Sequence, residues 1–192
     1  MTLVRNVRKV RKARDPLVPK LKDPANNVEV IDTKTPKGKI VVAKKDFARG
    51  ELVFEERPFL VLPGSSPQNG QSLLKWFEEA KSTQQEQLLA LCASPERALQ
   101  EVDDVRKRTT EQRRLVSRIV RTIEVNALEL ETGENDRGFF EWTCRISHSC
   151  CPNVSWYGSA DGTQSVRATC SIRQGEELTV NYISERSLLL PV

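Results

Sequence analysis

The only histidine of this 192-residue chain lies in the segment RISHSCCPN, residues 145–153, just before two adjacent cysteines. Thiols and an imidazole this close together could ligate zinc. Structural zinc sites favour two well-spaced pairs of ligands, whereas the spacing here is irregular and adjacent cysteines of an extended chain point to opposite faces. The candidate ligands are Cys144, His148, Cys150, Cys151 and Cys170. We therefore expect no metal site.

The same segment could instead hold a cysteine nucleophile with His148 as its base. Residues two apart in a strand share a face, but their side chains seldom meet at hydrogen-bond distance, so the spacing disfavours this interpretation too. Free cysteines are most often small buried side chains, and we expect the thiols to lie in the core. A third interpretation is that the segment is a backbone cradle for a cofactor.

A strand-like run follows, and it closes with GEELTVNY, residues 175–182, which ends at Tyr182. Upstream, apolar residues at helical spacing between Leu115 and Ile123 predict a helix with one buried stripe, and Asn126 points the same way as that stripe. A polar amide on a face that is turned toward the core needs a hydrogen-bond partner. Backbone and ligand both remain open as that partner.

The elements that must position these residues follow a strand–helix–strand order. Strand-like patterns occupy VEVID, KIVVAKK and ELVFEERPFLVL, all before residue 63. Helical spacing extends over about 71–131, and strand patterns resume beyond Gly133 with GFFEW, VSWYG, TQSVRATCSI and ELTVNYI. Strands on both sides of a helical insert predict an α+β domain with its helices grouped.

Four segments carry a resemblance to one family. RISHSCCPN resembles the R-I-N-H-S-C-x-P-N segment of SET domains, the lysine methyltransferase fold, and GEELTVNY resembles their G-E-E-L-T-x-x-Y segment. Residues 37–58, KGKIVVAKKDFARGELVFEERP, resemble the opening strands. Residues 125–150, VNALELETGENDRGFFEWTCRISHSC, are similar to the subfamily that includes the SET and MYND proteins. The resemblance covers residues 33–183.

The resemblance implies a SET-domain β-clip: small antiparallel sheets, the helical insert at about 71–131, and a pseudoknot formed by the HSC segment and the last strand. It also implies protein-lysine N-methylation of a histone or non-histone protein, with S-adenosyl-L-methionine as the cofactor. By the same resemblance Tyr182 is the catalytic residue, whose hydroxyl lies where the methyl donor and the lysine meet. The cofactor-binding residues would be Gly38, Lys39, Asn126, Ser147, His148 and Tyr182.

Three departures from the family pattern motivate an alternative. The G-x-G of the first strand ends in Ile40, Ser147 stands where the family has Asn, and no complete post-SET segment or MYND zinc module is expected in this sequence. A second glycine lets backbone approach a cofactor closely, and Ser has fewer hydrogen-bonding groups than Asn. The chain could therefore be a non-catalytic SET-like binding or adaptor module. A partner could also complete the lysine channel.

The composition fits a soluble globular protein, with 38% hydrophobic and 29% charged residues and a net charge of +4. No apolar run approaches the ~20 residues that cross a bilayer, so we expect no membrane partner. An odd number of cysteines and no visible secretory signal favour a reducing compartment, the nucleus or the cytoplasm.

Residues 1–27 form a basic segment that we expect to be a disordered tail, followed by a SET domain at 28–192. Eight Lys or Arg residues lie among the first 24. A solvated tail, a nuclear address, an arm that contacts nucleic acid and a mitochondrial presequence all remain open for this segment.

Overall fold

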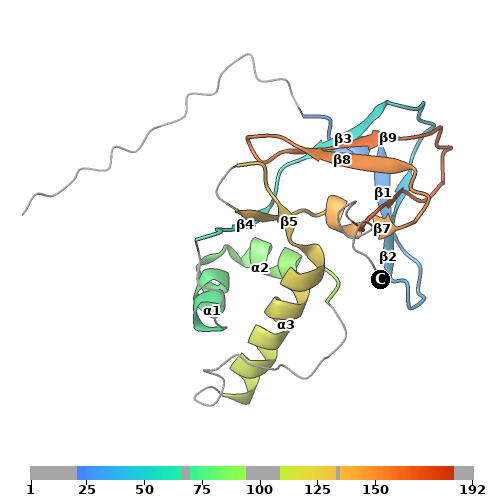
Figure 1. Ribbon diagram of the computed structural model, residues 1–192. Helices are drawn as coiled ribbons and strands as arrows, with labels where there is room; N and C mark the ends of the chain where they lie inside the picture. Colours follow the sequence, from blue (N-terminus) through green and yellow to red (C-terminus); the bar gives the residue numbers. More distant parts are fainter. Residues whose placement is uncertain (1–20, 66–69, 94–108, 133–134, 184–192) are drawn as a thin grey trace, which may run out of the picture.

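The computed structural model describes residues 21–65, 70–93, 109–132 and 135–183 (Figure 1). The first strands are β1 (Val28–Asp32), β2 (Lys39–Ala43), β3 (Leu52–Glu56) and β4 (Leu60–Leu62). The helices are α1 (Gly70–Glu79), α2 (Ser82–Leu89) and α3 (Thr110–Asn126). The later strands are β5 (Leu128–Glu129), β6 (Arg137–Phe139), β7 (Ser147–His148), β8 (Val154–Gly158), β9 (Gln164–Ala168) and β10 (Thr179–Val180). Short 3-10 helices occupy η1 (Pro24–Asn26) and η3 (Thr143–Arg145).

The strands form four small sheets, and the helices lie together on one side of them (Figure 1). Three sheets are antiparallel, in the orders β1-β2, β3-β9-β8 and β4-β6-β5. These sheets and the grouped helices confirm the predicted α+β class.

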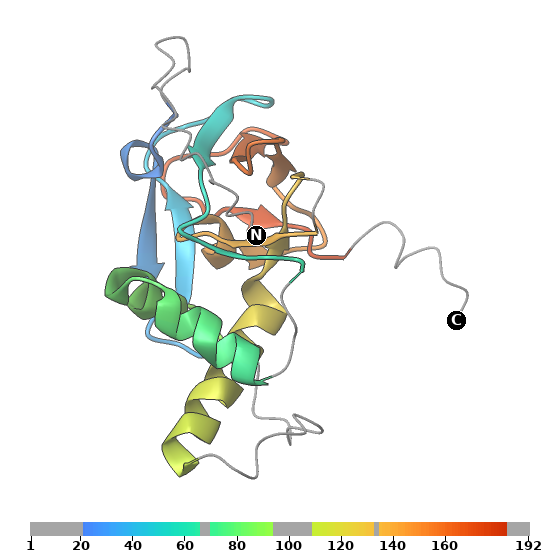
Figure 2. The ribbon, with the colours of Figure 1, turned by 90° about the vertical axis from the view of Figure 1, so that its left-hand side faces the viewer.

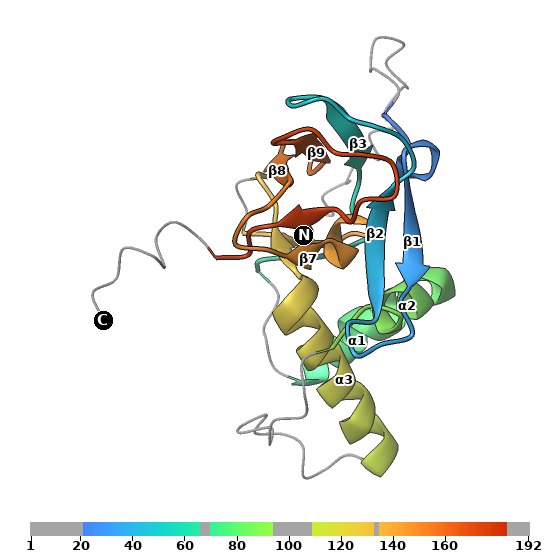
Figure 3. The ribbon, with the colours of Figure 1, turned by 90° about the vertical axis from the view of Figure 1, so that its right-hand side faces the viewer.

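The fourth sheet differs from the expectation, because β10 and β7 run parallel (Figure 3). Thr179 pairs with Ser147, and Val180 pairs with His148. Parallel neighbours need a long crossover, and here the β8–β9 hairpin and the loop after it supply that connection. The segment around the histidine and the end of the chain's last strand are thereby brought side by side.

Two hydrophobic clusters form the core. The first lies among β1, β2, β3, β8 and β9, with Trp142 and Trp156 packed against it. The second joins the helices to β4 and β6, and it includes Phe77, Leu88, Ile119 and Phe139. In α3 the buried stripe contains Val116, Ile119 and Ile123, so the predicted amphipathic helix is confirmed. Helices α1 and α2 both pack against α3 (Figure 2).

The folded part begins before Val28, which differs from the tail that we expected over 1–27. The side chain of Asn27 is buried and donates from Nδ2 to the carbonyl oxygen of Val53 at 2.8 Å. Glu55 N donates to Lys22 O at 3.0 Å, and Asp23 caps η1 through Ala25 N. These bonds attach residues 22–27 to β3. This part of the segment that we expected to be a disordered tail is therefore folded against the domain. Residues 1–20 lie outside the described residues.

Within the described residues, no helix combines the length and the apolar character that crossing a membrane requires.

Candidate functional site

A buried carboxylate positions the turn that leads into β7. Glu56, the last residue of β3, accepts hydrogen bonds from the backbone N–H groups of Glu141, Trp142 and Thr143 at 2.6–3.0 Å. The hydroxyl of Thr143 donates to the same carboxylate at 2.9 Å. Burial raises the pKa of Glu56, although these donors oppose the shift. The first turn of η3 is therefore anchored to β3.

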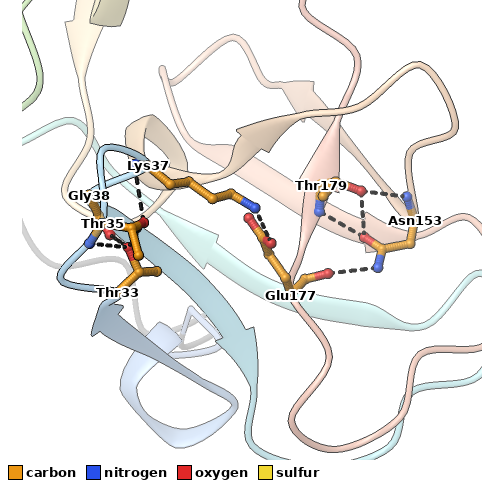
Figure 4. A network of polar contacts seen from close by, with 7 residues as sticks. All are labelled: Thr33, Thr35, Lys37, Gly38, Asn153, Glu177 and Thr179. Carbon is orange, nitrogen blue, oxygen red and sulfur yellow. Dashed lines mark hydrogen bonds and ion pairs between the residues drawn. The ribbon is translucent and has the colours of Figure 1, made fainter.

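The side chain of Asn153 holds the start of β10 in place (Figure 4). Its Nδ2 donates to Glu177 O at 2.9 Å, and its Oδ1 accepts from Thr179 N at 2.8 Å. One amide thus acts like a strand neighbour for residues 177–179. Together with the β7–β10 pairing, this bond pattern fixes where the segment that ends in Tyr182 and Ile183 leaves the sheet.

Tyr182 is held at both its backbone and its hydroxyl. Its N–H donates to His148 Nδ1 at 3.1 Å, and its hydroxyl donates to the carbonyl oxygen of Ile146. The ring stacks on Trp156 with 6.3 Å between centroids. Burial raises the pKa of the Tyr182 hydroxyl, and the thiols of Cys144 and Cys92 add to the shift. The tyrosine therefore stays a neutral hydroxyl at physiological pH.

A cavity of about 360 Å³ opens beside this tyrosine. Its wall combines the C-terminal end of α3, the η3 turn and two aromatic rings. The lining residues are Glu124, Val125, Asn126, Ala127, Leu128, Thr143, Cys144, Trp156 and Tyr182. The volume falls within the range of about 300–1,000 Å³ that is usual for small-molecule pockets.

Asn126 lies in this wall at the last residue of α3, and its amide has backbone partners. Nδ2 donates to Cys92 O and to Thr122 O, both at 2.7 Å. The sequence left open whether the Asn126 amide bonds to backbone or to a ligand, and in the structure its Nδ2 bonds to backbone carbonyls. The bond to Cys92 holds the end of α3 against the chain that follows α2, so this part of the cavity wall is tied to both helices.

The structure brings four of the six expected cofactor-binding residues together. Asn126 and Tyr182 line the cavity, His148 binds the Tyr182 backbone, and Ser147 lies on β7 next to Ile146. Gly38 and Lys39 do not line the cavity. They lie at the end of the β1–β2 hairpin, where Gly38 has a φ of 73° and its carbonyl accepts from Thr33 N at 3.0 Å.

The prediction that the cysteines weighed as zinc ligands lie in the core is wrong for three of the four. Cys150, Cys151 and Cys170 are exposed, as is Cys92, whereas Cys144 is partly buried. Desolvation raises the pKa of the Cys144 thiol to about 12. Its Sγ donates to Asn126 O at 3.2 Å, so this thiol is a packing and bonding element of the cavity wall.

The expectation that His148 and Cys150 do not meet is wrong as well. Cys150 Sγ lies 3.5 Å from His148 Nε2. Strand β7 ends at His148, and Cys151 N then donates to Ser149 Oγ at 3.1 Å, so the chain turns instead of continuing extended. The expectation assumed that the chain stays extended from His148 to Cys150, but β7 ends at His148. Across residues 21–65, 70–93, 109–132 and 135–183, no group of three or more His, Cys, Asp or Glu could hold a metal.

Sequence reasoning did not single out Glu56, Asn153 or Trp156. Glu56 and Asn153 are motif letters of the opening strands and of the RISHSCCPN segment, so the motifs contained them without indicating what they bind. Their partners are backbone N–H and C=O groups, which no side-chain pattern reveals. For Trp156, the sequence indicated only that it lies in a predicted strand, VSWYG.

Comparisons with known proteins identify the family of the chain. A SET domain family model matches residues 38–183. Among solved structures, the chain is similar to a Plasmodium falciparum protein assigned as a histone methyltransferase. That likeness has 12% identity and a TM-score of 0.44, and it covers 83% of this chain and 95% of that one.

Two further similar structures are Polycomb assemblies. One is a humanized mutant of the Chaetomium thermophilum Polycomb Repressive Complex 2, with 16% identity, a TM-score of 0.43 and coverage of 81% of this chain. The other is ctPRC2 bound to S-adenosylmethionine in an autoinhibited conformation, with 15% identity, a TM-score of 0.45 and the same coverage. The chain spans only 14% and 15% of those two chains. No curated protein matches the sequence. Since the family model covers well over half of the chain, the protein belongs to the SET domain family.

Proposed function

We propose that the protein is an S-adenosyl-L-methionine-dependent protein-lysine N-methyltransferase with Tyr182 as its catalytic residue. The observation that carries the proposal is the position of Tyr182. Its hydroxyl is held by a carbonyl of the RISHSCCPN segment while its ring lines a cavity of small-molecule size. Although Tyr182 is 56% exposed, its backbone N–H and its hydroxyl are both held by the segment around His148.

The residues around the cavity suit the cofactor in part. Asn126 and Tyr182 would hold it from the cavity, Ser147 and His148 from β7, and Gly38 and Lys39 from the hairpin. Amide and hydroxyl groups next to apolar walls, with an imidazole on β7, match a ligand that has polar ends on either side of a sulfonium centre. When bound, S-adenosyl-L-methionine supplies an electrophilic methyl group on a sulfonium sulfur.

In this proposal the chain contributes alignment. The Tyr182 hydroxyl and the Ile146 carbonyl oxygen lie together, and they would orient the incoming lysine amine. Because Tyr182 stays protonated near pH 7, it positions the amine and does not remove its proton. Holding two reactants in line can lower a barrier by about 7–11 kcal/mol in well-oriented systems.

The rim of the cavity suits a cationic side chain of a protein substrate. Trp156 and Tyr182 present stacked rings, and Glu124 supplies a carboxylate to the same wall. Aromatic faces and a carboxylate attract an ammonium group. A histone or another lysine-containing protein in the nucleus or the cytoplasm is the proposed substrate, and a partner protein that completes the lysine channel belongs to the proposal. Nucleic-acid binding through the basic N-terminal segment falls mostly outside the described residues.

The test pairs the two tyrosines of the chain. Tyr182→Phe removes the hydroxyl that contacts Ile146, whereas Tyr157→Phe removes one from a ring on β8 that is as exposed as Tyr182, each at 56%. We expect Tyr182→Phe to lower methyl transfer to histone and non-histone substrates by about 100-fold with the fold intact, and Tyr157→Phe to leave it unchanged. Equal activity of the two variants would contradict the role of Tyr182. Absence of cofactor binding by calorimetry in the folded wild-type protein would refute the proposed activity.

A non-catalytic SET-like binding module is the second candidate, because Gly38 and Lys39 do not line the cavity and Ile40 occupies the position of the family's second glycine. It predicts a folded protein that binds a protein partner but no S-adenosyl-L-methionine. The same calorimetric titration separates the two candidates.

A further inference from the structure

The tip of the β1–β2 hairpin, residues 33–38, is closed by its own hydrogen bonds (Figure 4). Thr33 Oγ1 donates to Gly38 O at 2.7 Å, and Gly38 N donates to Thr35 O at 2.9 Å. These bonds shape the turn but do not attach it to the body of the domain. The position of the turn must therefore be set by other contacts.

Backbone pairing holds β2 to residues 175–178 but stops short of the tip. Gly175 N and Leu178 N donate to Ala43 O and Val41 O, both at 2.8 Å. Beyond that point the chain leaves β2 and pairs with β7 instead. Residues 37–40 thus extend past the last backbone bond between β2 and this segment.

One ion pair spans the gap. Lys37 Nζ lies 2.5 Å from Glu177 Oε2, although the two residues are 140 positions apart (Figure 4). Within the described part of the chain, it is the one polar side-chain contact between the tip and residues outside the β1–β2 hairpin.

Glu177 is a firmly placed partner. Its backbone carbonyl accepts from Asn153 Nδ2, its side chain is 23% exposed, and its Oε1 is buried with no hydrogen-bond partner among the described residues. A carboxylate in this condition depends on a counter-ion more than a freely solvated one does. Lys37 supplies that counter-ion and directly precedes Gly38 and Lys39.

We propose that Lys37 and Glu177 are positioning residues that hold the hairpin tip, and thereby Gly38 and Lys39, in place for the cofactor. This inference rests on the proposed function, because Gly38 and Lys39 matter only if a cofactor binds there. The chain of contacts runs from Asn153 through Glu177 and Lys37 to Gly38. It links the RISHSCCPN segment to the turn of the first hairpin.

Lys34 provides the matched control. It lies in the same turn and pairs with Asp32 at 2.9 Å, but that pair is local to the hairpin and its lysine side chain is 83% exposed. Replacing Lys34 by Met therefore removes an equal charge from the same turn without releasing the tip.

The experiment measures two quantities in the full chain. Hydrogen exchange reports the opening of the tip, residues 33–38, without any ligand, and calorimetry reports the dissociation constant of S-adenosyl-L-methionine. We expect Lys37→Met and Glu177→Gln to speed exchange at the tip and to weaken cofactor binding about fivefold, as loss of a partly exposed ion pair allows. Lys34→Met should change neither quantity. The exchanged pair, Lys37→Glu with Glu177→Lys, should recover part of both losses.

Unchanged exchange at the tip in Lys37→Met would overturn the inference. So would faster exchange with wild-type cofactor affinity, because the tip would then be held without mattering for the ligand. If the wild-type protein binds no cofactor, the proposed function fails. The exchange measurement then still decides whether the ion pair holds the tip.

Discussion

Asn153 supports Thr179 across 26 positions of sequence, because its side-chain oxygen accepts the Thr179 N–H at 2.8 Å while its nitrogen donates to Glu177. One amide thereby replaces two backbone partners at the point where the last strand begins. The placement of Tyr182, three residues later, depends on this bond pattern.

Substitution of Asn153 should loosen the last strand in two steps. Asn153→Asp keeps the acceptor for Thr179 N but loses the donor to Glu177 O, and we expect a loss of about 1–2 kcal/mol in the free energy of unfolding. Asn153→Ala loses both bonds and should cost about 2–3 kcal/mol. Urea denaturation measures both values. Asn181→Ala, which removes only a local bond to Ile183 N, is the control and should stay within about 0.5 kcal/mol. Equal losses for the Asp and Ala variants would contradict the two-bond account.

Glu56 should make stability depend on pH in an unusual direction. Because burial raises its pKa in the folded state above the ordinary value of 4.5, the folded protein binds its proton more readily than the unfolded chain does. Its contribution to the free energy of unfolding therefore increases as pH falls from neutral toward 4.5.

Comparison with Glu56→Gln isolates this contribution. The variant places an amide N–H among backbone donors, so we expect a loss of about 1–3 kcal/mol that is larger at pH 5 than at pH 8. Urea denaturation across this pH range measures the difference between the two proteins. A difference that is constant with pH would show that the carboxyl group does not titrate differently in the two states.

Cys144 should resist alkylation. Its pKa of about 12 leaves very little thiolate at pH 8, and thiolate is the reactive form. The exposed Cys92, Cys150, Cys151 and Cys170 serve as internal controls in the same molecule. We expect iodoacetamide to modify those four at least 100-fold faster, as followed by peptide mass spectrometry. Comparable rates at Cys144 in the folded protein would mean that the cavity wall opens readily.

Gly138 in β6 should not tolerate a methyl group. An added Cβ would lie 2.8 Å from Leu130 Cδ2 and 2.9 Å from Phe140 Cε2, and both of those side chains are buried. Gly138→Ala should therefore overpack this region and lower the free energy of unfolding by about 1–3 kcal/mol. A lower melting temperature would show this loss. Gly158→Ala is the control, because the 2.8 Å neighbour there is Cγ of the exposed Glu131, which can move away. Equal stability of the two variants would show that the β4–β6–β5 region relaxes more than its packing implies.

Much of the fold could be predicted from local patterns. The strand-like patterns in VEVID, KIVVA and VSWYG correspond to β1, β2 and β8. Helical spacing located the buried stripe of α3. These features depend on neighbours in sequence, which is why sequence reasoning recovers them.

What could not be predicted depends on distant partners. The parallel pairing of β10 with β7 joins segments 32 positions apart, and nothing local to either strand sets its direction. The exposure of Cys150 and its contact with His148 follow from where β7 ends, which is a matter of one residue. The docking of residues 22–27 depends on β3. Motif letters could name Tyr182 but could not indicate that Gly38 and Lys39 lie away from its cavity.

The cavity lies at the seam between the two hydrophobic clusters, since Trp156 packs with the first, while Ala127 and Cys144 pack with the second. Neither cluster alone can build its wall. Fraying of the helical layer would erase one side of the pocket while the β3-β9-β8 sheet remained intact. On heating, the cavity would then be lost before the sheet structure, and a ligand bound in the cavity would make the two clusters unfold together.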